Sequence, residues 1–177
     1  MVAPGLSKRW VVLATLAKQF GLKRFAEIGV RDGRMSGPLL DLIPDAHLIA
    51  VDPWQPCGSF YHWTPELHRR NERLFDQVSR RHPGRITKIK ATSEEAALQV
   101  PDGSLDCAFI DGDHSYEAVS LDIRLWRPKV KPGGILSGHD YHNNIRYKDK
   151  FIGVDRAVDE AFPVVNSESD SVWWIQI

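Results

Sequence analysis

Glycines and carboxylates stand together in the segment Glu27-Ile28-Gly29-Val30-Arg31-Asp32-Gly33, which follows an apolar run. Gly29 allows a tight turn and a close backbone approach to a ligand, and Gly33 can open a helix without a Cβ in the way. The spacing G-x-x-x-G differs from the G-x-G-x-x-G of dinucleotide sites. Glu27 beside the loop favours a ligand with a cationic part. An ordinary strand–helix turn is the alternative interpretation.

Asp52 is placed where it could recognise a ribose. It ends the apolar run Ile49-Ala50-Val51 and lies 23 residues beyond Gly29. Nucleotide-binding α/β folds place at this distance a carboxylate that accepts hydrogen bonds from a ribose diol. A solvated carboxylate is the alternative, but together with the glycine loop Asp52 favours a nucleoside site.

Acids and histidines are densest in two segments of the second half of the chain. Residues 106–116 read D-C-A-F-I-D-G-D-H-S-Y, and residues 133–141 read G-G-I-L-S-G-H-D-Y. A histidine with a pKa near ~6.5 can accept a proton from a hydroxyl group, and His114 and His142 are the candidates for that base. A capping or solvated role is the alternative for each histidine. For Asp113 we favour a cap of the helix expected near Ser115.

These segments must be positioned by a sheet, because short apolar runs alternate with longer amphipathic ones. The expected strands are Arg24–Ile28, His47–Val51, Ile86–Ile89, Leu105–Ile110, Gly134–Ser137, Val164–Asn166 and Val172–Ile177. The expected helices are Arg34–Ile43, Pro65–His82, Ser93–Gln99, Tyr116–Trp126 and Val154–Phe162, preceded by an N-terminal packing helix within residues 1–21 that Ser7 could cap and Gly21 could end.

This alternation predicts one α/β domain over residues 1–177, with a Rossmann-like, mostly parallel sheet and helices on both faces. The last two expected strands are joined only by Ser167–Ser171, which permits a hairpin but no crossover, so the last strand must be antiparallel. Ligands of such sheets bind beyond the carboxyl ends of the strands.

Together, the glycine loop, Asp52 and the two acid–histidine segments resemble class I S-adenosylmethionine-dependent methyltransferases. The similarity is to the macrocin-type sugar O-methyltransferases in particular, with their I-D-G-D-H-S-Y and G-G-x-x-x-G-H-D-Y signatures. It covers residues 24–162 and implies a seven-stranded sheet whose last strand is antiparallel. It also implies S-adenosyl-L-methionine as cofactor, with a divalent cation, Mg²⁺ or Mn²⁺, assisting methyl transfer to a hydroxyl of a sugar or a glycosylated small metabolite.

The resemblance assigns site residues position by position. Glu27, Gly29 and Gly33 form the methionine-side loop, Asp52 is the ribose acid, and Ala91-Thr92-Ser93 is the adenine-side turn. The implied cofactor-binding residues are Glu27, Gly29, Gly33, Asp52, Thr92, Ser93 and Asp111; the implied metal ligands are Asp111, His139 and Asp140. His139 departs from the oxygen ligands that Mg²⁺ prefers. In an alternative arrangement only the two aspartates bind metal and His139 is turned away, because neighbours on a strand point to opposite faces.

The implied catalytic residues are His114, Asp111 and His142. We favour His114 as base, because it lies three residues after Asp111, where related catechol-type enzymes place theirs. A helix N-terminus would lower the pKa of His114 and keep it neutral. His142 belongs to the loop after the fifth strand. Two aromatic or polar stretches are expected to form substrate walls: Trp54, Phe60, Tyr61 and Trp63, and the loop from Tyr141 to Phe151.

Composition limits the partners. Lys+Arg and Asp+Glu both number 23, so the net charge is zero, which argues against binding to nucleic acid or to a membrane surface. The two cysteines fit no disulfide framework and indicate a reducing, cytoplasmic location. We expect a small-molecule or carbohydrate acceptor. The chain has almost no N-terminal cap domain, so the substrate is expected to be large or the site to be closed by a second copy in a homo-oligomer.

Two other functions remain open. Asp111-Gly112-Asp113 reads as the D-x-D metal motif of a nucleotide-sugar glycosyltransferase, although here it follows a complete nucleoside site. A methyltransferase-like binding subunit without turnover is the alternative from outside the enzymes.

Overall fold

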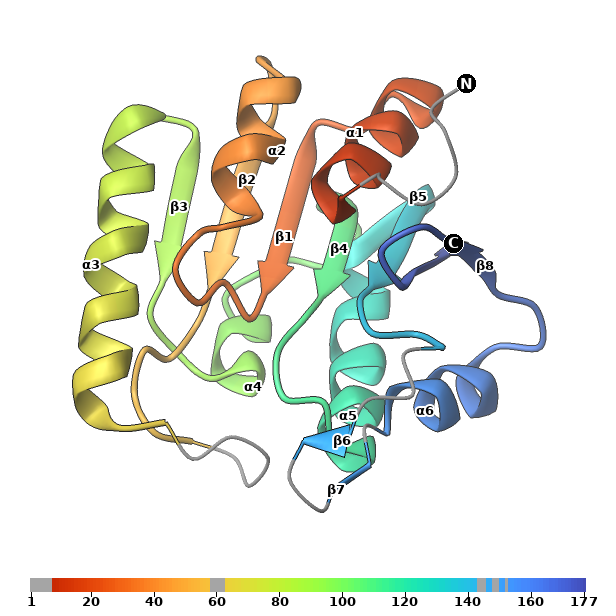
Figure 1. Ribbon diagram of the computed structural model, residues 1–177. Helices are drawn as coiled ribbons and strands as arrows, with labels where there is room; N and C mark the ends of the chain where they lie inside the picture. Colours follow the sequence, from red (N-terminus) through yellow and green to blue (C-terminus); the bar gives the residue numbers. More distant parts are fainter. Residues whose placement is uncertain (1–7, 58–62, 143–145, 148–149, 152) are drawn as a thin grey trace.

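A seven-stranded mixed sheet forms the centre of the protein (Figure 1). The computed structural model describes residues 8–57, 63–142, 146–147, 150–151 and 153–177. In this part of the chain the strand order is β3-β2-β1-β4-β5-β9-β8. The strands are β1 (Arg24–Ile28), β2 (His47–Val51), β3 (Ile86–Ile89), β4 (Leu105–Ile110), β5 (Val130–Gly138), β8 (Asn166–Glu168) and β9 (Val172–Gln176).

The direction of the strands confirms the expected α/β class. Strands β1 to β5 pair in parallel, and β9 is antiparallel to both β5 and β8. Two short strands, β6 (Arg146–Tyr147) and β7 (Lys150–Phe151), form a separate antiparallel ribbon. The order reverses between β1 and β4, so the carboxyl ends of these strands form the edge where a ligand binds in such sheets.

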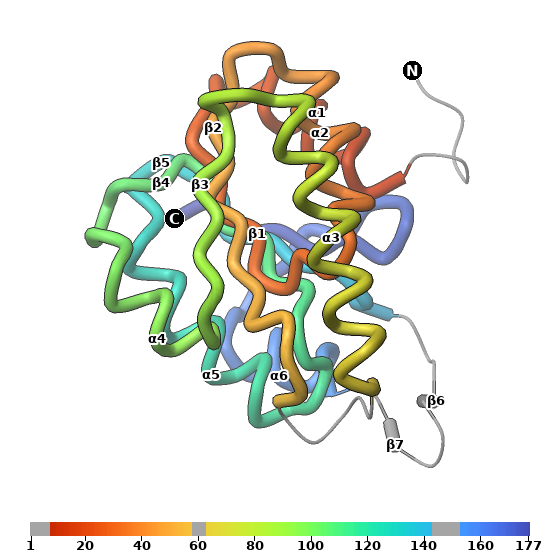
Figure 2. The backbone as a smooth tube through the Cα atoms, turned by 90° about the vertical axis from the view of Figure 1, so that its left-hand side faces the viewer, coloured from red at the N-terminus to blue at the C-terminus, as the bar shows by residue number. Residues whose placement is uncertain are grey.

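Helices cover both faces of the sheet, as the edge-on view shows (Figure 2). One layer contains α1 (Arg9–Phe20), α2 (Ser36–Leu42) and α3 (Pro65–Arg81). The other contains α4 (Ser93–Ala97), α5 (Tyr116–Trp126) and α6 (Val154–Ala161), with a 3₁₀ turn, η1 (Arg127–Lys129), after α5. Each layer has its own apolar core, one around Leu13, Leu39 and Phe75 and the other around Trp126 and Trp173. Among the described helices, none is both long and apolar enough to cross a membrane.

Several element ends differ from the sequence prediction. Gly21 ends α1 in the left-handed conformation, as expected, but the N-cap is Lys8, which makes no side-chain capping bond; Ser7 lies outside the described residues. Helix α2 begins at Ser36 and not at Arg34, because the glycine loop continues through a turn. Strand β8 is displaced to Asn166–Glu168, since Val164 is 77% exposed and pairs with no strand.

Candidate functional site

Three neighbouring strands bring the predicted site segments together. The ends of β1 and β4 lie side by side, with Ile28 opposite Ile110, and Ile110 is opposite Gly138 of β5. The backbone bonding continues past these ends: Asp111 N–H donates to Ile28 O at 2.8 Å, and His139 N–H donates to Ile110 O at 3.1 Å. The glycine loop, Asp111 and His139-Asp140 therefore meet at one edge of the sheet.

The glycine loop lies against the backbone that follows β4. Gly29 has a φ of +91°, and a Cβ there would overlap the backbone of Asp111 and Gly112. Gly33 has a φ of +78° and faces α3 closely enough that a Cβ would press on Phe75 and Val78. Both positions therefore require glycine, one for the approach of two loops and the other for helix packing.

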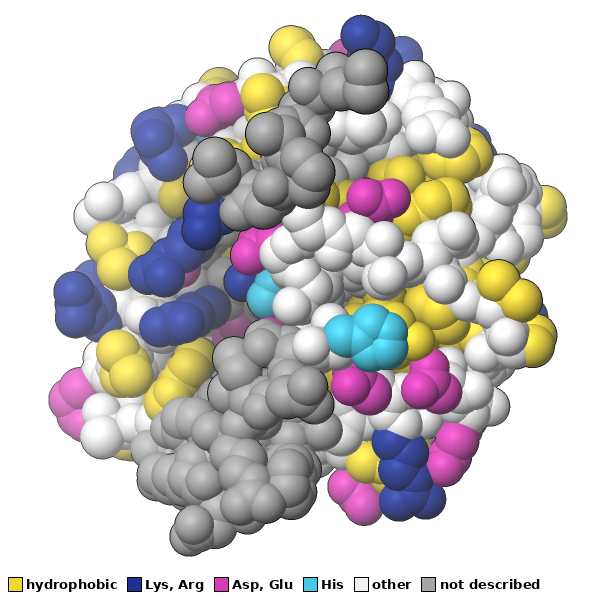
Figure 3. Space-filling model, turned by 45° about the vertical axis from the view of Figure 1, so that its right-hand side comes forward, with side chains coloured by type: hydrophobic (Ala, Val, Ile, Leu, Met, Phe, Trp, Pro, Cys, Tyr) yellow, Lys and Arg dark blue, Asp and Glu magenta, His cyan; other side chains and the backbone are white. Residues whose placement is uncertain are grey.

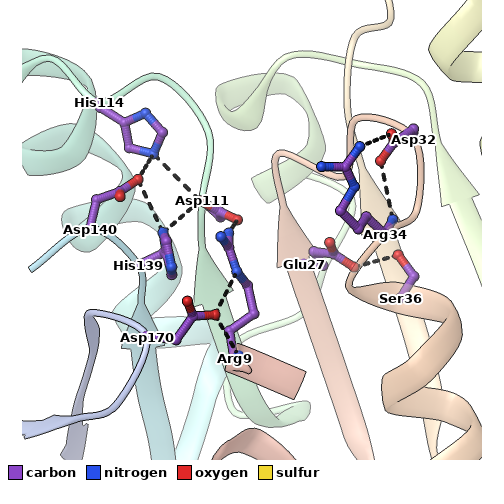
Figure 4. A network of polar contacts seen from close by, with 10 residues as sticks. All are labelled: Arg9, Glu27, Asp32, Arg34, Ser36, Asp111, His114, His139, Asp140 and Asp170. Carbon is purple, nitrogen blue, oxygen red and sulfur yellow. Dashed lines mark hydrogen bonds and ion pairs between the residues drawn. The ribbon is translucent and has the colours of Figure 1, made fainter. Parts of the chain in front are cut away.

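Glu27 lies buried beneath this loop. It is 1% exposed, and Ser36 Oγ donates a hydrogen bond to its Oε2 at 2.6 Å (Figure 4). Burial raises the pKa of Glu27 to about 8. A buried carboxyl group gains most from a cationic neighbour. The role of Glu27 toward a positively charged ligand stays a prediction, and the structure adds the buried hydrogen bond with Ser36.

Asp52 joins the loops that follow β1 and β2. Its two oxygens accept backbone N–H groups from Arg31 at 2.8 Å and from Trp54 at 2.7 Å. Both donors have positive φ, +57° and +43°, so the carboxylate stabilises two strained residues. Burial raises the pKa of Asp52. The role of Asp52 toward a ribose stays a prediction, and the structure adds a structural role to it.

The aromatic wall expected after β2 is only partly present. Trp54 is 2% exposed, stacks on Phe75 with ring centroids 5.1 Å apart, and donates its Nε1–H to Arg31 O at 2.7 Å. Trp54 is therefore a core residue, and its prediction as a substrate wall was wrong. Trp63 lies 4.9 Å from the Arg31 guanidinium, and Phe60 and Tyr61 lie outside the described residues.

Thr92 and Ser93 use their hydroxyls inside the protein. Thr92 caps α4 in a reciprocal pair with Glu95. Ser93 Oγ donates to Asp122 and accepts the Trp126 Nε1–H at 2.8 Å, and burial raises the pKa of Asp122 to about 7. These contacts explain both side chains without a ligand, and their part in cofactor binding stays a prediction.

Asp111, His114, His139 and Asp140 form a compact cluster, which we call the acid–histidine cluster (Figure 4). His114 Nε2 lies 2.8 Å from Asp140 Oδ2 and 3.4 Å from Asp111 Oδ1. His139 Nδ1 lies 3.1 Å and 3.7 Å from the same two oxygens. The alternative in which His139 turns away from the cluster was wrong. Asp140 has a φ of +61°, so the alternation of a strand no longer holds there.

The sequence predicted a lowered pKa and a neutral imidazole for His114, and the charges of the cluster show that this prediction was wrong. Burial opposes a charge on this imidazole, but Asp111 and Asp140 outweigh burial and raise the pKa of His114 to about 9. The adjacent carboxylates therefore override the expected effect of the helix dipole. Burial also opposes the charge of Asp140, but His114 and His139 outweigh it and lower the pKa of Asp140. Without an ion, His114 therefore holds a proton at neutral pH.

Arg9 and Asp170 complete the site, although no motif pointed to them. Arg9, the first residue of α1, donates from its guanidinium to Asp111 Oδ2 at 2.5 Å. Its backbone N–H donates to Asp170 Oδ2 at 2.8 Å, and its Nε lies 3.6 Å from the same oxygen. Asp170 belongs to the turn between β8 and β9. Positions 161 residues apart therefore meet beside Asp111, a pairing with no local sequence signal.

Three other predicted residues lie outside the cluster or take a different role. The His142 side chain is 65% exposed, its Nδ1 lies 3.8 Å from Asp155 Oδ2 on α6, and its backbone N–H donates to Asp155 Oδ1. His142 therefore does not join the cluster. Asp113 accepts the Ser115 N–H at 2.8 Å, and Ser115 itself caps α5, which corrects the expected capping residue. Tyr141 is 7% exposed and donates to Asp159, so it packs in the core and forms no substrate wall.

The cluster offers the donor set of a divalent-cation site. One ligand atom each from Asp111, His139 and Asp140 lies within 4.8 Å of the others. Among the residues that the structure describes, neither buried ring nitrogen of His139 has a hydrogen-bond partner. The space-filling view shows histidine, acidic and basic side chains within a hollow of the surface (Figure 3). Carboxylate oxygens and imidazole nitrogens fit a divalent ion.

Comparisons with known proteins agree with this arrangement. A family model described as a methyltransferase domain matches residues 26–141. An uncharacterized protein of Acanthamoeba polyphaga mimivirus is 28% identical over 124 residues, which are 67% of this chain and 52% of that protein. An uncharacterized protein of Sinorhizobium fredii is 28% identical over 95 residues, 52% of this chain and 10% of that protein. The chain thus spans about half or less of these curated relatives.

Solved structures share the fold at low sequence identity. An O-methyltransferase from Bacillus cereus in complex with SAH has a TM-score of 0.67 at 13% identity, covering 99% of this chain and 84% of that one. SAH-bound PaMTH1 from Podospora anserina has a TM-score of 0.64 at 15% identity, covering 97% and 79%. The O-methyltransferase NovP has a TM-score of 0.63 at 18% identity, covering 92% and 75%.

Proposed function

The chain belongs to the methyltransferase-domain family, and from that premise we propose that it is an S-adenosylmethionine-dependent O-methyltransferase. We propose as its acceptor a hydroxyl group of a sugar or a glycosylated small metabolite. The observation that carries the proposal is a juxtaposition inside the matched segment. The glycine loop over Glu27 and the acid–histidine cluster meet at the adjoining ends of β1 and β4.

The glycine-loop side suits the charge and shape of the cofactor. S-adenosylmethionine carries a sulfonium and an ammonium group, and buried Glu27 would meet that positive charge. Gly29 would let the backbone approach the methionine part, and Asp52 would accept hydrogen bonds from the ribose diol. SAH in two of the related structures, including the one from Bacillus cereus, supports this cofactor.

The acid–histidine cluster would prepare the acceptor. Methyl transfer breaks the carbon–sulfur bond and forms a carbon–oxygen bond, and the acceptor hydroxyl must lose its proton. The protein must align the hydroxyl oxygen in line with the methyl group and provide a group that takes the proton. A divalent ion held by Asp111, His139 and Asp140 would lower the pKa of such a hydroxyl. Arg9 keeps Asp111 oriented toward the cluster through Oδ2.

The sugar acceptor rests on the signature segments. Residues 110–116 and 133–141 match the two signatures of the macrocin-type sugar O-methyltransferases. Trp63, with the Arg31 guanidinium against its ring, supplies an aromatic and cationic surface after β2. Aromatic faces together with polar groups are typical of sites for polar small molecules.

Calorimetry followed by turnover tests the proposal. The chain should bind S-adenosylmethionine and not UDP-sugars, and should release S-adenosylhomocysteine when given a panel of glycosylated hydroxyl acceptors. Binding of UDP-sugars alone would indicate the glycosyltransferase. Binding of S-adenosylmethionine without turnover on any acceptor would indicate a binding subunit.

A further inference from the structure

We propose that His114 is a fourth ligand of the cation site, beside Asp111, His139 and Asp140. The site then consists of two carboxylates and two imidazoles and selects a divalent transition ion over Mg²⁺. This inference deepens the proposed function and rests on it for the use of the ion in methyl transfer. The metal binding itself is a property of the folded chain. It can be measured without cofactor or acceptor.

The geometry of the cluster carries the inference. Asp111 Oδ1 and Asp140 Oδ2 both lie between His114 Nε2 and His139 Nδ1, at nitrogen–oxygen distances of 2.8, 3.1, 3.4 and 3.7 Å. Ligand atoms about 2.1 Å from one ion in tetrahedral geometry are roughly 3.4 Å apart. The four contacts bracket that spacing. His114 therefore stands in the same relation to the two oxygens as His139 does.

A second observation concerns the buried nitrogens of His139. The residue is 7% exposed, and within the described part of the chain neither ring nitrogen makes a hydrogen bond. Buried polar atoms without a partner are rare and call for an explanation. The Nδ1 atom faces a carboxylate oxygen at 3.1 Å without hydrogen-bond geometry. A cation bound by His139 Nδ1 and by that Asp140 oxygen would give each of these two atoms a partner.

The surrounding charges favour a divalent ion. Arg9 binds the other oxygen of Asp111, and Asp170 balances the charge of Arg9. Asp111 and Asp140 place two carboxylates against the imidazoles. A divalent ion with two neutral imidazoles would make the buried site neutral.

Nitrogen donors decide the class of ion. Mg²⁺ demands an octahedral set of oxygens, whereas imidazole suits the later ions such as Fe²⁺, Co²⁺, Ni²⁺ and Zn²⁺. Half of the four protein donors here are nitrogens. A His114 imidazole that gives Nε2 to an ion cannot take the acceptor's proton with the same atom. The inference therefore moves His114 from the role of base to the role of ligand.

Titration of the full chain with Co²⁺ and with Mg²⁺ tests the assignment. Calorimetry measures the binding of both ions, and visible absorption measures the binding of Co²⁺. We expect Co²⁺ to bind at least about 100-fold more tightly than Mg²⁺. His114→Gln should weaken Co²⁺ binding about 10- to 100-fold or more, as should His139→Gln. His142→Gln is the matched control, because its imidazole is exposed and its contacts are with Asp155 of α6 and not with the cluster, so this variant should leave Co²⁺ affinity unchanged. S-adenosylmethionine affinity of each variant reports on the fold.

A second measurement on the unaltered chain keeps the test independent of folding in the variants. Proton NMR of the Co²⁺-loaded protein should show two strongly shifted, exchangeable imidazole N–H signals. A single such signal, equal Co²⁺ affinity in His114→Gln and His142→Gln, or tighter binding of Mg²⁺ than of Co²⁺ would overturn the assignment. Failure of the proposed function would appear separately, as missing S-adenosylmethionine binding or turnover with Co²⁺ binding intact.

Discussion

The two sides of the site are built by different means. On the glycine-loop side, two glycines, backbone N–H groups and Glu27 come from β1, β2 and the turns directly after them. On the cluster side, side chains from the loops after β4 and β5 contact one another, and Arg9 in the first turn of α1 links Asp111 to Asp170 in the β8–β9 turn. The first side depends on local backbone shape and the second on long-range side-chain contacts. The two sides should therefore fail in different ways when they are altered.

The largest expected effect is the loss of turnover without loss of cofactor binding. Asp140→Asn removes one carboxylate from the cluster, so the rate should fall about 10²–10⁴-fold. Removal of divalent ions with a chelator should have a similar effect. S-adenosylmethionine affinity, measured by calorimetry, should stay nearly constant in both cases, because the glycine-loop side is intact.

Asp102→Asn is a matched control for the Asp140 variant. Asp102 also belongs to an ion pair, with Lys129 at 2.7 Å, but it is exposed and precedes β4, whereas Asp111 follows the other end of that strand. Its rate should equal that of the unaltered chain. Full activity of the unaltered chain in excess chelator would remove the ion from the mechanism and leave the cluster with proton transfer alone.

The same division explains what could be predicted from sequence. The order and type of the elements followed from apolar periodicity, and the antiparallel β9 followed from the short link before it. The loops around Gly29 and Asp52 could also be predicted from the sequence, because the conformation of each loop is specified by neighbouring residues. The pairing of Arg9 with Asp111 and Asp170 was not, since it depends on where α1 and the last hairpin pack. The core position of Trp54 could not be predicted for the same reason, because it depends on packing against Phe75 of α3.

The next effect should fall on cofactor affinity alone. Asp52→Asn removes the charge that would bind the ribose diol while keeping an oxygen for one of the backbone N–H groups of Arg31 and Trp54. S-adenosylmethionine binding should weaken by about 1.5–3 kcal/mol, the usual value of a charge-assisted hydrogen bond. The rate at saturating cofactor should change little. Unchanged cofactor affinity would contradict the ribose assignment.

Glu27 should make stability depend on pH. Its pKa is raised to about 8 when folded, against a value of 4.5 when unfolded, so between these values the folded chain binds more protons. The free energy of unfolding contributed by Glu27 is therefore fully present below pH 4.5 and is lost as the pH rises through about 8, by at most about 1.4 kcal/mol per pH unit.

Urea denaturation across this pH range measures the contribution of Glu27. The loss of stability on raising the pH should be smaller in Glu27→Gln than in the unaltered chain, because the amide has no proton to lose. Glu117→Gln, at an exposed carboxyl of α5, is the control and should keep the original slope. Parallel pH curves for Glu27→Gln and the unaltered chain would show that Glu27 is already ionised in the folded protein.

The smallest effect should come from the contact that joins distant parts of the chain. Arg9→Gln keeps a donor but loses the charge and the fork that hold Asp111 and Asp170. Asp111 would then be free to rotate away from the cluster, and turnover should fall about 10-fold. That loss corresponds to about 1.4 kcal/mol, slightly less than the ~1.5–3 kcal/mol of a whole charge-assisted hydrogen bond, because Arg9 acts on the reaction only through Asp111. Lys23→Gln, which breaks an exposed pair with Asp45, should change the rate by less than about twofold.

Asp170→Asn should add little to the loss of turnover in Arg9→Gln, because both residues act on Asp111 through the same guanidinium. Fully additive losses in a double-mutant cycle would show that the two residues act separately.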